Sequence, residues 1–305
     1  MTDVGRRLPV VQTGQLPASA PVFQRVAVVG LGLIGGSLAM AVRQAWPAAL
    51  VIGIDNNDVL EAAIRLHAVD VGADDPIVAA EADLVVLAGP GRENERMLAR
   101  LPAIIPGEAV VTDVGSAKRS IVAAAAALPD RLSFVGGHPF AGSTRAGITA
   151  ARPDLFRGRP WFLTPQSASD AVMDRLRGLV RAVGGDPVSI TPAEHDRLLA
   201  YLSQMPQVAA SAIMAVVGEA VGDEGLGYSG RGLAETTRLA ASPASAWTDA
   251  YEANADHVGA AIDALIAVLS SMRDRLDSPE AIAALFAAAN QWRARLPRRQ
   301  DCVEP

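Results

Sequence analysis

The stretch Arg25-Val-Ala-Val-Val-Gly30-Leu-Gly-Leu-Ile-Gly35-Gly-Ser37 decides which fold this chain can adopt. Its apolar first half predicts a buried strand, and apolar residues at helical spacing from Leu38 onward predict a helix directly after it. Between the two stands Gly-x-Gly-x-x-Gly, in the strand–turn–helix context of a dinucleotide-binding fingerprint. The first glycine permits the tight turn, the second lets the backbone approach a pyrophosphate, and the third lets helix and strand pack closely. We therefore expect these residues to bind a dinucleotide: Gly30, Gly32, Leu33, Ile34 and Gly35.

A second apolar run, residues 50–54, predicts another strand and ends in Asp55. This acid lies about twenty residues beyond the last fingerprint glycine, where a carboxylate can bind a ribose 2′-hydroxyl. A carboxylate here also disfavours a 2′-phosphate, so the sequence favours NAD over NADP as the cofactor.

Apolar runs alternate with helical patterns along residues 24–190. The predicted strands are 26–29, 50–54, 84–88, 109–113, 133–136, 161–163 and 187–190, and the predicted helices are 58–67, 92–104, 117–128 and 170–183. Such alternation is typical of an α/β fold with a doubly wound, mostly parallel sheet of the Rossmann type. Because ligands bind beyond the carboxyl ends of these strands, we expect the segments that follow them to line the site. Those expected to contact the cofactor are Gly89, Pro90, Asp113 and Ser116.

From residue 191 onward the sequence predicts helices only. Thr191 and Glu194 form a capping box at the start of a long helix, which Pro206 should kink or interrupt. Ser-Pro pairs at 242 and 278 predict the starts of two more helices. We expect residues 191–305 to form an all-helical domain for substrate binding and dimerisation. Its many apolar residues indicate a homodimer interface; the alternative is a tightly packed monomer.

Composition excludes several classes of protein. The 305 residues carry a net charge of −6, which gives no nucleic-acid footprint. The one cysteine, Cys302, allows no disulfide framework, and this fits a reducing, cytoplasmic location. We see no signal peptide and no apolar run of the roughly 18 to 20 residues that a membrane span needs. Residues 1–23 show no periodicity and predict a disordered arm. We also expect no bound metal.

One of the four histidines stands where chemistry is expected. His138 follows a predicted strand at the carboxyl end of the sheet, beside the expected nicotinamide position. Histidine titrates near neutrality, so it suits a base that removes a hydroxyl proton as hydride leaves the same carbon. His67 is interpreted as structural within a helix, and His195 and His257 as solvated residues on polar helix faces; a turn role for His138 remains the alternative.

Several blocks of the chain resemble prephenate and arogenate dehydrogenases. They are Gly30–Ser37, Thr112-Asp-Val-Gly-Ser-Ala-Lys118, Gly137-His-Pro-Phe-Ala-Gly-Ser143, Leu155-Phe-Arg-Gly-Arg-Pro-Trp161, Glu194-His-Asp196 and Thr236-Thr-Arg-Leu-Ala-Ala-Ser-Pro243 with Trp247. The resemblance implies an oxidative decarboxylation: hydride passes from the ring carbon bearing the hydroxyl group to NAD, and the ring carboxylate leaves as carbon dioxide. The implied reaction converts prephenate to 4-hydroxyphenylpyruvate, a step of aromatic amino acid biosynthesis.

The resemblance also implies roles for individual residues. His138 and Ser116 would be catalytic, the first as the base and the second beside the ring hydroxyl. Arg238 would bind a substrate carboxylate, for which its planar fork is suited, and Ser143 lies in a substrate-binding block. Many family members carry Ser-His-Leu-Pro-His on the long helix, whereas this chain has Ser203-Gln-Met-Pro-Gln207. Gln204 and Gln207 are therefore expected to meet the substrate side chain through neutral hydrogen bonds.

Other functions remain open at this point. The substrate could be an amino analogue, arogenate or 4-amino-4-deoxyprephenate. A β-hydroxyacid-type dehydrogenase would use a lysine on the long helix, but Lys118 is the chain's only lysine. A non-enzymatic NAD-sensing module would not need His138, Ser116 and Arg238 together. The lone Lys118 stands beside the expected site, which suggests that a compact ammonium is needed there.

Overall fold

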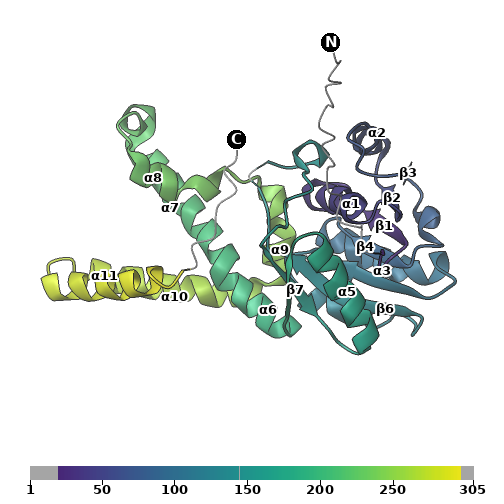
Figure 1. Cartoon of the computed structure of the whole chain (residues 1–305). Coiled ribbons are helices and arrows are strands. Elements are labelled where there is room, and N and C mark those ends of the chain that lie inside the picture. The colour runs from purple at the N-terminus through teal and green to yellow at the C-terminus, as the bar shows by residue number, and fades with distance from the viewer. Residues whose placement is uncertain (1–19, 144, 297–305) are drawn as a thin grey trace, which may run out of the picture. The chain divides into compact units, whose positions relative to one another are not determined.

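The structure, a computed structural model, describes residues 20–143 and 145–296 (Figure 1). Contacts divide the chain into two compact units, Met1–Asn254 and Ala255–Pro305. The division falls well after residue 190, where the sequence predicts the domain boundary, because the first helical segments after 190 pack with the sheet.

An eight-stranded sheet in the order β3-β2-β1-β4-β5-β6-β7-β8 organises the first unit. Its strands are β1 (Arg25–Val29), β2 (Leu50–Ile54), β3 (Val71–Ala73), β4 (Leu84–Leu87), β5 (Ala109–Asp113), β6 (Leu132–Pro139), β7 (Pro160–Thr164) and β8 (Asp186–Ser189). Neighbouring strands from β3 to β6 run parallel, and only β6 and β7 pair antiparallel. The order 3-2-1-4-5-6 is that of the Rossmann fold, with its switch in strand order between β1 and β4. The predicted α/β fold class is confirmed; β3 is the one strand that the sequence did not predict.

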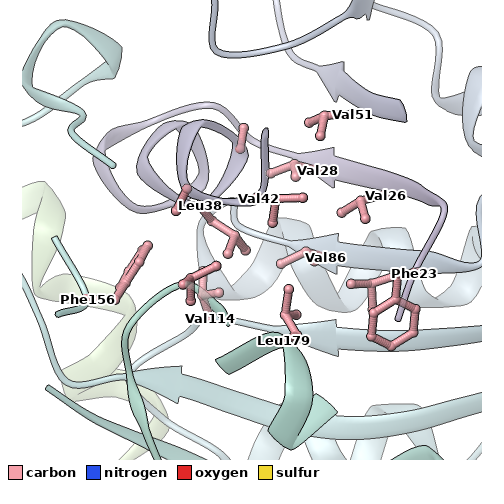
Figure 2. Close-up of a cluster of buried hydrophobic side chains, with 14 of the residues drawn as sticks. Phe23, Val26, Val28, Leu38, Val42, Val51, Val86, Val114, Phe156 and Leu179 are labelled. Carbon is pink, nitrogen blue, oxygen red and sulfur yellow. The ribbon is translucent and has the colours of Figure 1, made fainter. Parts of the chain in front are cut away.

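Helices cover both faces of the sheet. Apolar side chains of α1 (Leu33–Ala45), α2 (Asn57–Arg65) and α5 (Asp170–Ala182) pack on one face. Figure 2 shows Leu38 and Val42 of α1 beside Val26, Val28 and Val86 of the sheet. On the other face lie α3 (Gly91–Ile104), α4 (Arg119–Ala125) and the short 3₁₀ helix η1 (Pro76–Ala79). Because both faces are covered, the central strands are near-continuous apolar runs, as parallel strands usually are.

The start of the folded chain differs from the prediction. Residues 1–19 of the predicted disordered arm lie outside the described residues. Phe23, which the prediction places in that arm, is completely buried in the core, with the guanidinium of Arg175 4.2 Å from its ring centroid. The Arg175 Nε also donates to the Val22 carbonyl. The predicted boundary at residue 23 is therefore wrong, because an isolated aromatic residue carries no periodicity by which to recognise it.

The long helix after the sheet begins and breaks where the sequence predicts. In α6 (Pro192–Leu199) the Thr191 side chain accepts from the Glu194 N–H, and the Glu194 side chain accepts from the Thr191 N–H. A π-helical turn, η3 (Ala200–Gln204), then leads into α7 (Met205–Leu226). Pro206 has no N–H to give to the carbonyl four residues earlier, and wider turns of this kind are common where that ladder is interrupted. The interrupted turn lies directly against the site described below.

Short helices follow α7 and complete the first unit. They are α8 (Arg231–Thr236), η4 (Arg238–Ala241), η5 (Ala244–Ala246) and α9 (Thr248–Ala253). The helix predicted from the Ser-Pro pair at 242 is only the 3₁₀ turn η5, so that prediction is wrong in length. In the second unit, α10 (Ala255–Arg273) is followed by α11 (Pro279–Arg293), where Ser278 caps the helix as predicted by accepting from the Ala281 N–H. No strand occurs after residue 190 within the part of the chain that the structure describes.

Two helical segments are long and apolar enough to cross a membrane by length and composition alone, Pro192–Leu226 and Ala255–Arg273. The expectation that no stretch reaches this length is therefore wrong. One or two such helices are weak evidence for a membrane span, because the core helices of soluble proteins pass the same test.

Candidate active site

The turn after β1 forms a cradle that fits a dinucleotide. Gly30 has φ of +96°, and a Cβ there would lie 2.7 Å from backbone atoms of Ala88 and Gly89. A Cβ on Gly35 would lie 1.9 Å from the Gly30 carbonyl oxygen, so helix and turn are in direct backbone contact. At Gly32 a Cβ would meet nothing within 4 Å, which leaves that backbone open to a ligand. Gly32, the N-cap of α1, has no side chain to accept from the first N–H groups of the helix, which begins with Leu33 and Ile34. Phosphates bind at helix N-termini of this kind.

Asp55 closes the other side of this cradle. Its Oδ2 accepts from the Leu31 N–H at 2.7 Å, and its Oδ1 accepts from the N–H and Nδ2 of Asn56 at 2.7 and 2.8 Å. The carboxylate is thus fixed at the end of β2 beside the glycine turn. This is the geometry in which the acid binds a ribose 2′-hydroxyl.

The turn after β4 is held by one buried side chain. Asn94 Oδ1 accepts from the Gly89 N–H at 3.0 Å, while its Nδ2 donates to the Gly89 carbonyl at 2.9 Å. Pro90 is the N-cap of α3 and stands exposed. Gly89 and Pro90 therefore lie beside Gly30, at the switch in strand order where the sequence predicts the cofactor.

Asp113, the last residue of β5, is buried and joins two turns of the site. Its Oδ2 accepts from the Gly115 N–H at 2.8 Å, and its Oδ1 accepts from the Gly137 N–H at 3.1 Å. The ammonium of Lys118, also buried, forms an ion pair with the same carboxylate. Asp113 thus connects the turn after β5 to β6, and Ser116, in the same turn after β5, is exposed.

His138 lies near the end of β6 and faces a second histidine. Its Nδ1 is 2.9 Å from Nε2 of His195 in α6, and Nδ1 of His195 is 2.8 Å from Oδ1 of Asp196. The rings of Phe140 and Phe162 lie around the pair, with Phe162 in edge contact with His195 at 5.4 Å between centroids. The interpretation of His195 as solvated is wrong, because this residue is completely buried.

The burial of His195 has a signal in the sequence. His195 and Leu199 are four residues apart on α6, so they share one face of the helix, and both are buried. His67 was also misplaced: it lies beyond the end of α2, exposed, with φ of +53°.

Asp196 is the centre of a hydrogen-bond network that sequence reasoning missed. It accepts from the Lys118 N–H at 2.7 Å, and from the N–H and Nε of Arg119 at 2.9 and 3.2 Å. The Asp196 carbonyl accepts from Nδ2 of Asn254 at 2.8 Å, and the same Nδ2 lies 2.7 Å from Oε1 of Gln204. The network connects the sheet, α6, the π-helical turn and the end of α9.

Burial dominates the electrostatics of the two histidines. Burial, the neighbouring His195 and the Lys118 charge hold the pKa of His138 well below its ordinary value. Burial also lowers the pKa of His195, although the hydrogen bond to Asp196 acts in the opposite direction. Burial raises the pKa of Asp196, but hydrogen bonds from His195 and from the N–H groups of Arg119 and Lys118 outweigh it and lower the pKa overall. Both imidazoles are therefore neutral near pH 7 beside an ionised Asp196.

Other predicted substrate residues occupy different surroundings. Arg238 begins η4 and is exposed, and its side chain makes no hydrogen bond or ion pair with the described residues. Ser143 is exposed, and its Oγ accepts from the Arg145 N–H at 3.1 Å. Gln207 is buried on α7; its Nε2 donates to the Leu239 carbonyl at 2.8 Å, and its Oε1 has no partner among the described residues.

Gln204 differs from Gln207 in what its amide contacts. Only 1% of its surface is exposed; its Oε1 accepts from Asn254, and its Nε2 lies 3.5 Å from the Ala250 carbonyl. The structure therefore places Gln204 inside the network that supports the histidines. No group of three or more potential metal ligands occurs among the described residues.

Comparison with known proteins agrees with this geometry. Residues 38–189 match the family model of the prephenate dehydrogenase nucleotide-binding domain, and residues 191–287 match that of the prephenate dehydrogenase dimerization domain. A prephenate dehydrogenase of Bacillus subtilis is 33% identical over 92% of this chain and 78% of its own length.

Two solved structures have the same fold over most of this chain. One is a prephenate dehydrogenase from A. aeolicus in complex with hydroxyphenyl propionate and NAD⁺ (TM-score 0.81, 28% identity, 89% of this chain and 98% of that one). The other is a Synechocystis arogenate dehydrogenase (TM-score 0.74, 27% identity, 89% of this chain and 100% of that one). The matched nucleotide-binding domain and the NAD⁺ complex of the A. aeolicus relative support NAD as the cofactor. This chain belongs to the prephenate dehydrogenase family and is an NAD-dependent dehydrogenase.

Proposed function

We propose that this enzyme catalyses the NAD-dependent oxidative decarboxylation of prephenate to 4-hydroxyphenylpyruvate. The observation that best supports the proposal is the position of His138, a buried neutral imidazole at the carboxyl end of β6, on the same edge of the sheet as the dinucleotide cradle. A base for a ring hydroxyl group must be unprotonated, and the lowered pKa of this imidazole keeps it so near neutral pH.

In this proposal each residue has one task. NAD, when bound, accepts the hydride that leaves the ring carbon bearing the hydroxyl group. His138 takes the hydroxyl proton, and the exposed Ser116 positions the same hydroxyl group. Arg238 holds a substrate carboxylate, since its guanidinium is exposed and has no partner among the described residues. Ser143 lies in the turn after β6 and contacts the substrate from that side. Aromatisation of the ring supplies much of the driving force, so the protein chiefly positions these groups.

In this proposal Gln207 hydrogen-bonds to the side chain of the substrate. Gln204, in this proposal, supports Asn254 instead of touching the substrate, because its amide is engaged within the protein. Neither glutamine carries the negative charge that an ammonium would need in a buried site, and we therefore favour prephenate. Arogenate is the second candidate: the unpartnered Gln207 Oε1 is a hydrogen-bond acceptor, and one structural relative is an arogenate dehydrogenase.

A turnover assay tests the substrate directly. Prephenate, arogenate and 4-amino-4-deoxyprephenate are each supplied with NAD and with NADP, and reduced cofactor is followed by absorbance. We expect the highest kcat/KM with prephenate and NAD. A higher kcat/KM with either amino compound would reject prephenate as the preferred substrate.

Arg238→Gln tests the proposed carboxylate contact. Arg238 would bind a charge that is present before the transition state, so its loss should raise KM and leave kcat much less affected. Arg231→Gln is a matched control, because Arg231 is 94% exposed in its side chain and pairs only with Glu235 among the described residues. An unchanged KM in Arg238→Gln would mean that Arg238 is an ordinary surface residue and does not bind the substrate carboxylate.

We also propose that the enzyme is a cytoplasmic homodimer whose helical segments form the interface. Large apolar side chains are exposed on α7 and α10, among them Ile213, Val216, Ile266 and Leu269. A subunit interface would cover them, which the matched dimerization domain supports and which also accounts for two helices apolar enough for a membrane. Light scattering at micromolar concentration should give twice the mass of the chain, and a monomer would refute the proposal.

A further inference from the structure

We propose that His195 and Asp196 act together with His138 as one proton-holding unit. When His138 receives the substrate's proton at Nε2, its own Nδ1 proton moves to Nε2 of His195, and the positive charge comes to rest beside Asp196. This inference rests on the proposed function of His138 as the base. It makes His195 a positioning residue that acts through His138.

The contacts fix which ring nitrogens carry protons. An ionised carboxylate only accepts hydrogen bonds, so the Nδ1 of His195, 2.8 Å from Asp196 Oδ1, must carry a proton. The Nε2 of a neutral His195 is then an acceptor. The Nδ1 of His138, 2.9 Å away, must therefore donate to it. This leaves Nε2 of His138 without a proton, free to accept one from a substrate hydroxyl group.

Asp196 fixes the direction of the chain of hydrogen bonds, because its carboxylate can only accept. Asp196 accepts two backbone N–H groups, those of Lys118 and Arg119, as well as the Arg119 Nε. All of these are permanent donors, so they require an ionised, accepting carboxylate. Because Asp196 stays an acceptor, the tautomers of both histidines are set by the fold before any ligand arrives.

Neighbouring charges favour the same final position of the proton. The groups around the two rings are the Lys118 ammonium, the Asp113 carboxylate, Asp196 with its partner Arg119, and the apolar rings of Phe140 and Phe162. The ionised Asp196 contacts His195 and not His138, so an imidazolium is more stable on His195. The directions of the pKa shifts agree: His138 is lowered well below its ordinary value, and in His195 the hydrogen bond to Asp196 opposes the effect of burial.

The proposed reaction gives this arrangement a purpose. Loss of hydride and carbon dioxide from the substrate dianion leaves a singly charged product, so the overall conversion neither takes up nor releases a proton. The loss of one proton from the ring hydroxyl group is therefore balanced by the return of one proton to the same oxygen as the ring becomes aromatic. A pair of buried histidines can hold it within the protein for that interval, since His195 is 0% and His138 8% exposed.

The tautomers can be measured without any turnover. The chain has four histidines, so selective ¹⁵N-histidine labelling gives a spectrum simple enough to assign. The variants His67→Gln and His257→Gln identify the signals of the other two histidines and leave the buried pair His138 and His195 intact. We expect both buried rings, at pH 7.5, to be neutral with protonated Nδ1 and unprotonated Nε2. A protonated Nε2 on His138 would overturn the proposal.

The proton transfer itself is tested by isotope kinetics. NADH formation in a single turnover with prephenate is followed in mixtures of H₂O and D₂O. Two protons in motion predict a curved dependence of the rate on deuterium fraction in the wild-type enzyme and in His67→Gln. In His195→Gln we expect a linear dependence and a rate lower by roughly 10- to 100-fold, as for other residues that orient a functional histidine.

The proton transfer to His195 and the proposed function are contradicted by different results. A linear dependence in the active wild-type enzyme would overturn the transfer to His195. No NADH from prephenate or arogenate, in a protein whose buried rings show the expected tautomers, would instead overturn the proposed function.

Discussion

The ammonium of Lys118 and the carboxylate of Asp113 form an ion pair closed to solvent, with side chains 0% and 1% exposed. Asp113 also accepts the N–H groups of Gly115 and Gly137. The pair thereby joins the turn that carries Ser116 to the strand end that carries His138. Elsewhere arginine has replaced lysine throughout the chain, so this one position retains the compact cation.

Lys118→Arg should reduce activity and stability together. The chain is tightly packed around the lysine: a Cβ on Gly136 would lie 3.2 Å from Lys118 Cδ. A guanidinium is broader than an ammonium and would have to displace this strand, and overpacking of this kind commonly costs about 1–3 kcal/mol. We expect a lower kcat and a lower melting temperature. Arg100→Lys, an exposed exchange in the opposite direction, should change neither. Wild-type kinetics in Lys118→Arg would mean that chance alone left a lysine here.

Asp55 should determine the preference for NAD. Its carboxylate is the acceptor for the Leu31 N–H, so Asp55→Asn is a milder change than Asp55→Ala because it retains an acceptor while removing the charge. Without repulsion of the 2′-phosphate, the ratio of kcat/KM for NAD to that for NADP should fall in both variants. Asp58→Asn removes the same charge from an exposed position in the first turn of α2 and should leave the ratio unchanged. A wild-type preference for NADP would contradict this role of Asp55.

Periodic features of the sequence were enough to predict the sheet and most of its helices. The glycine turn, Asp55 and the capping box at Thr191 each act within a few residues, so their local patterns determine their structures. The effect of Pro206 was predictable for the same reason, because a missing N–H is a property of one residue.

The supporting network could not be predicted, because its members are far apart in the sequence. His195 and His138 are separated by 57 positions, and Asn254 and Asp196 by 58. A charged or polar residue on a helix resembles a surface residue until the fold shows what lies against it. Phe23 illustrates the same point for the core, since nothing local distinguishes a buried aromatic residue from one in an unstructured arm.

The activity of the enzyme should persist at mildly acidic pH. Burial, the neighbouring His195 and Lys118 hold the pKa of His138 well below its ordinary value, and the base works only when it is neutral. The fall of kcat/KM on the acid side should therefore lie below the usual histidine range near pH 6.5.

His138→Asn should lower kcat by roughly 10²- to 10⁴-fold and leave NAD binding nearly intact. If this variant keeps most of its activity, the proton leaves by another route.

The last prediction concerns the side-chain end of the substrate. The motif on the long helix has glutamines, which do not titrate, in place of histidines. The KM for prephenate should therefore change little between pH 6 and 8. Gln207→His should introduce a pH dependence, with tighter binding at the acid end, because a protonated imidazole attracts the keto acid's carboxylate. Gln207 lies against η4 through the Leu239 carbonyl, next to Arg238, so the new charge would stand near the proposed carboxylate site. Gln44→His, the same exchange at an exposed position near the end of α1, is the control and should leave the profile flat. A flat profile in Gln207→His as well would mean that residue 207 does not face the substrate, and the substrate's side chain would have to be bound by another segment.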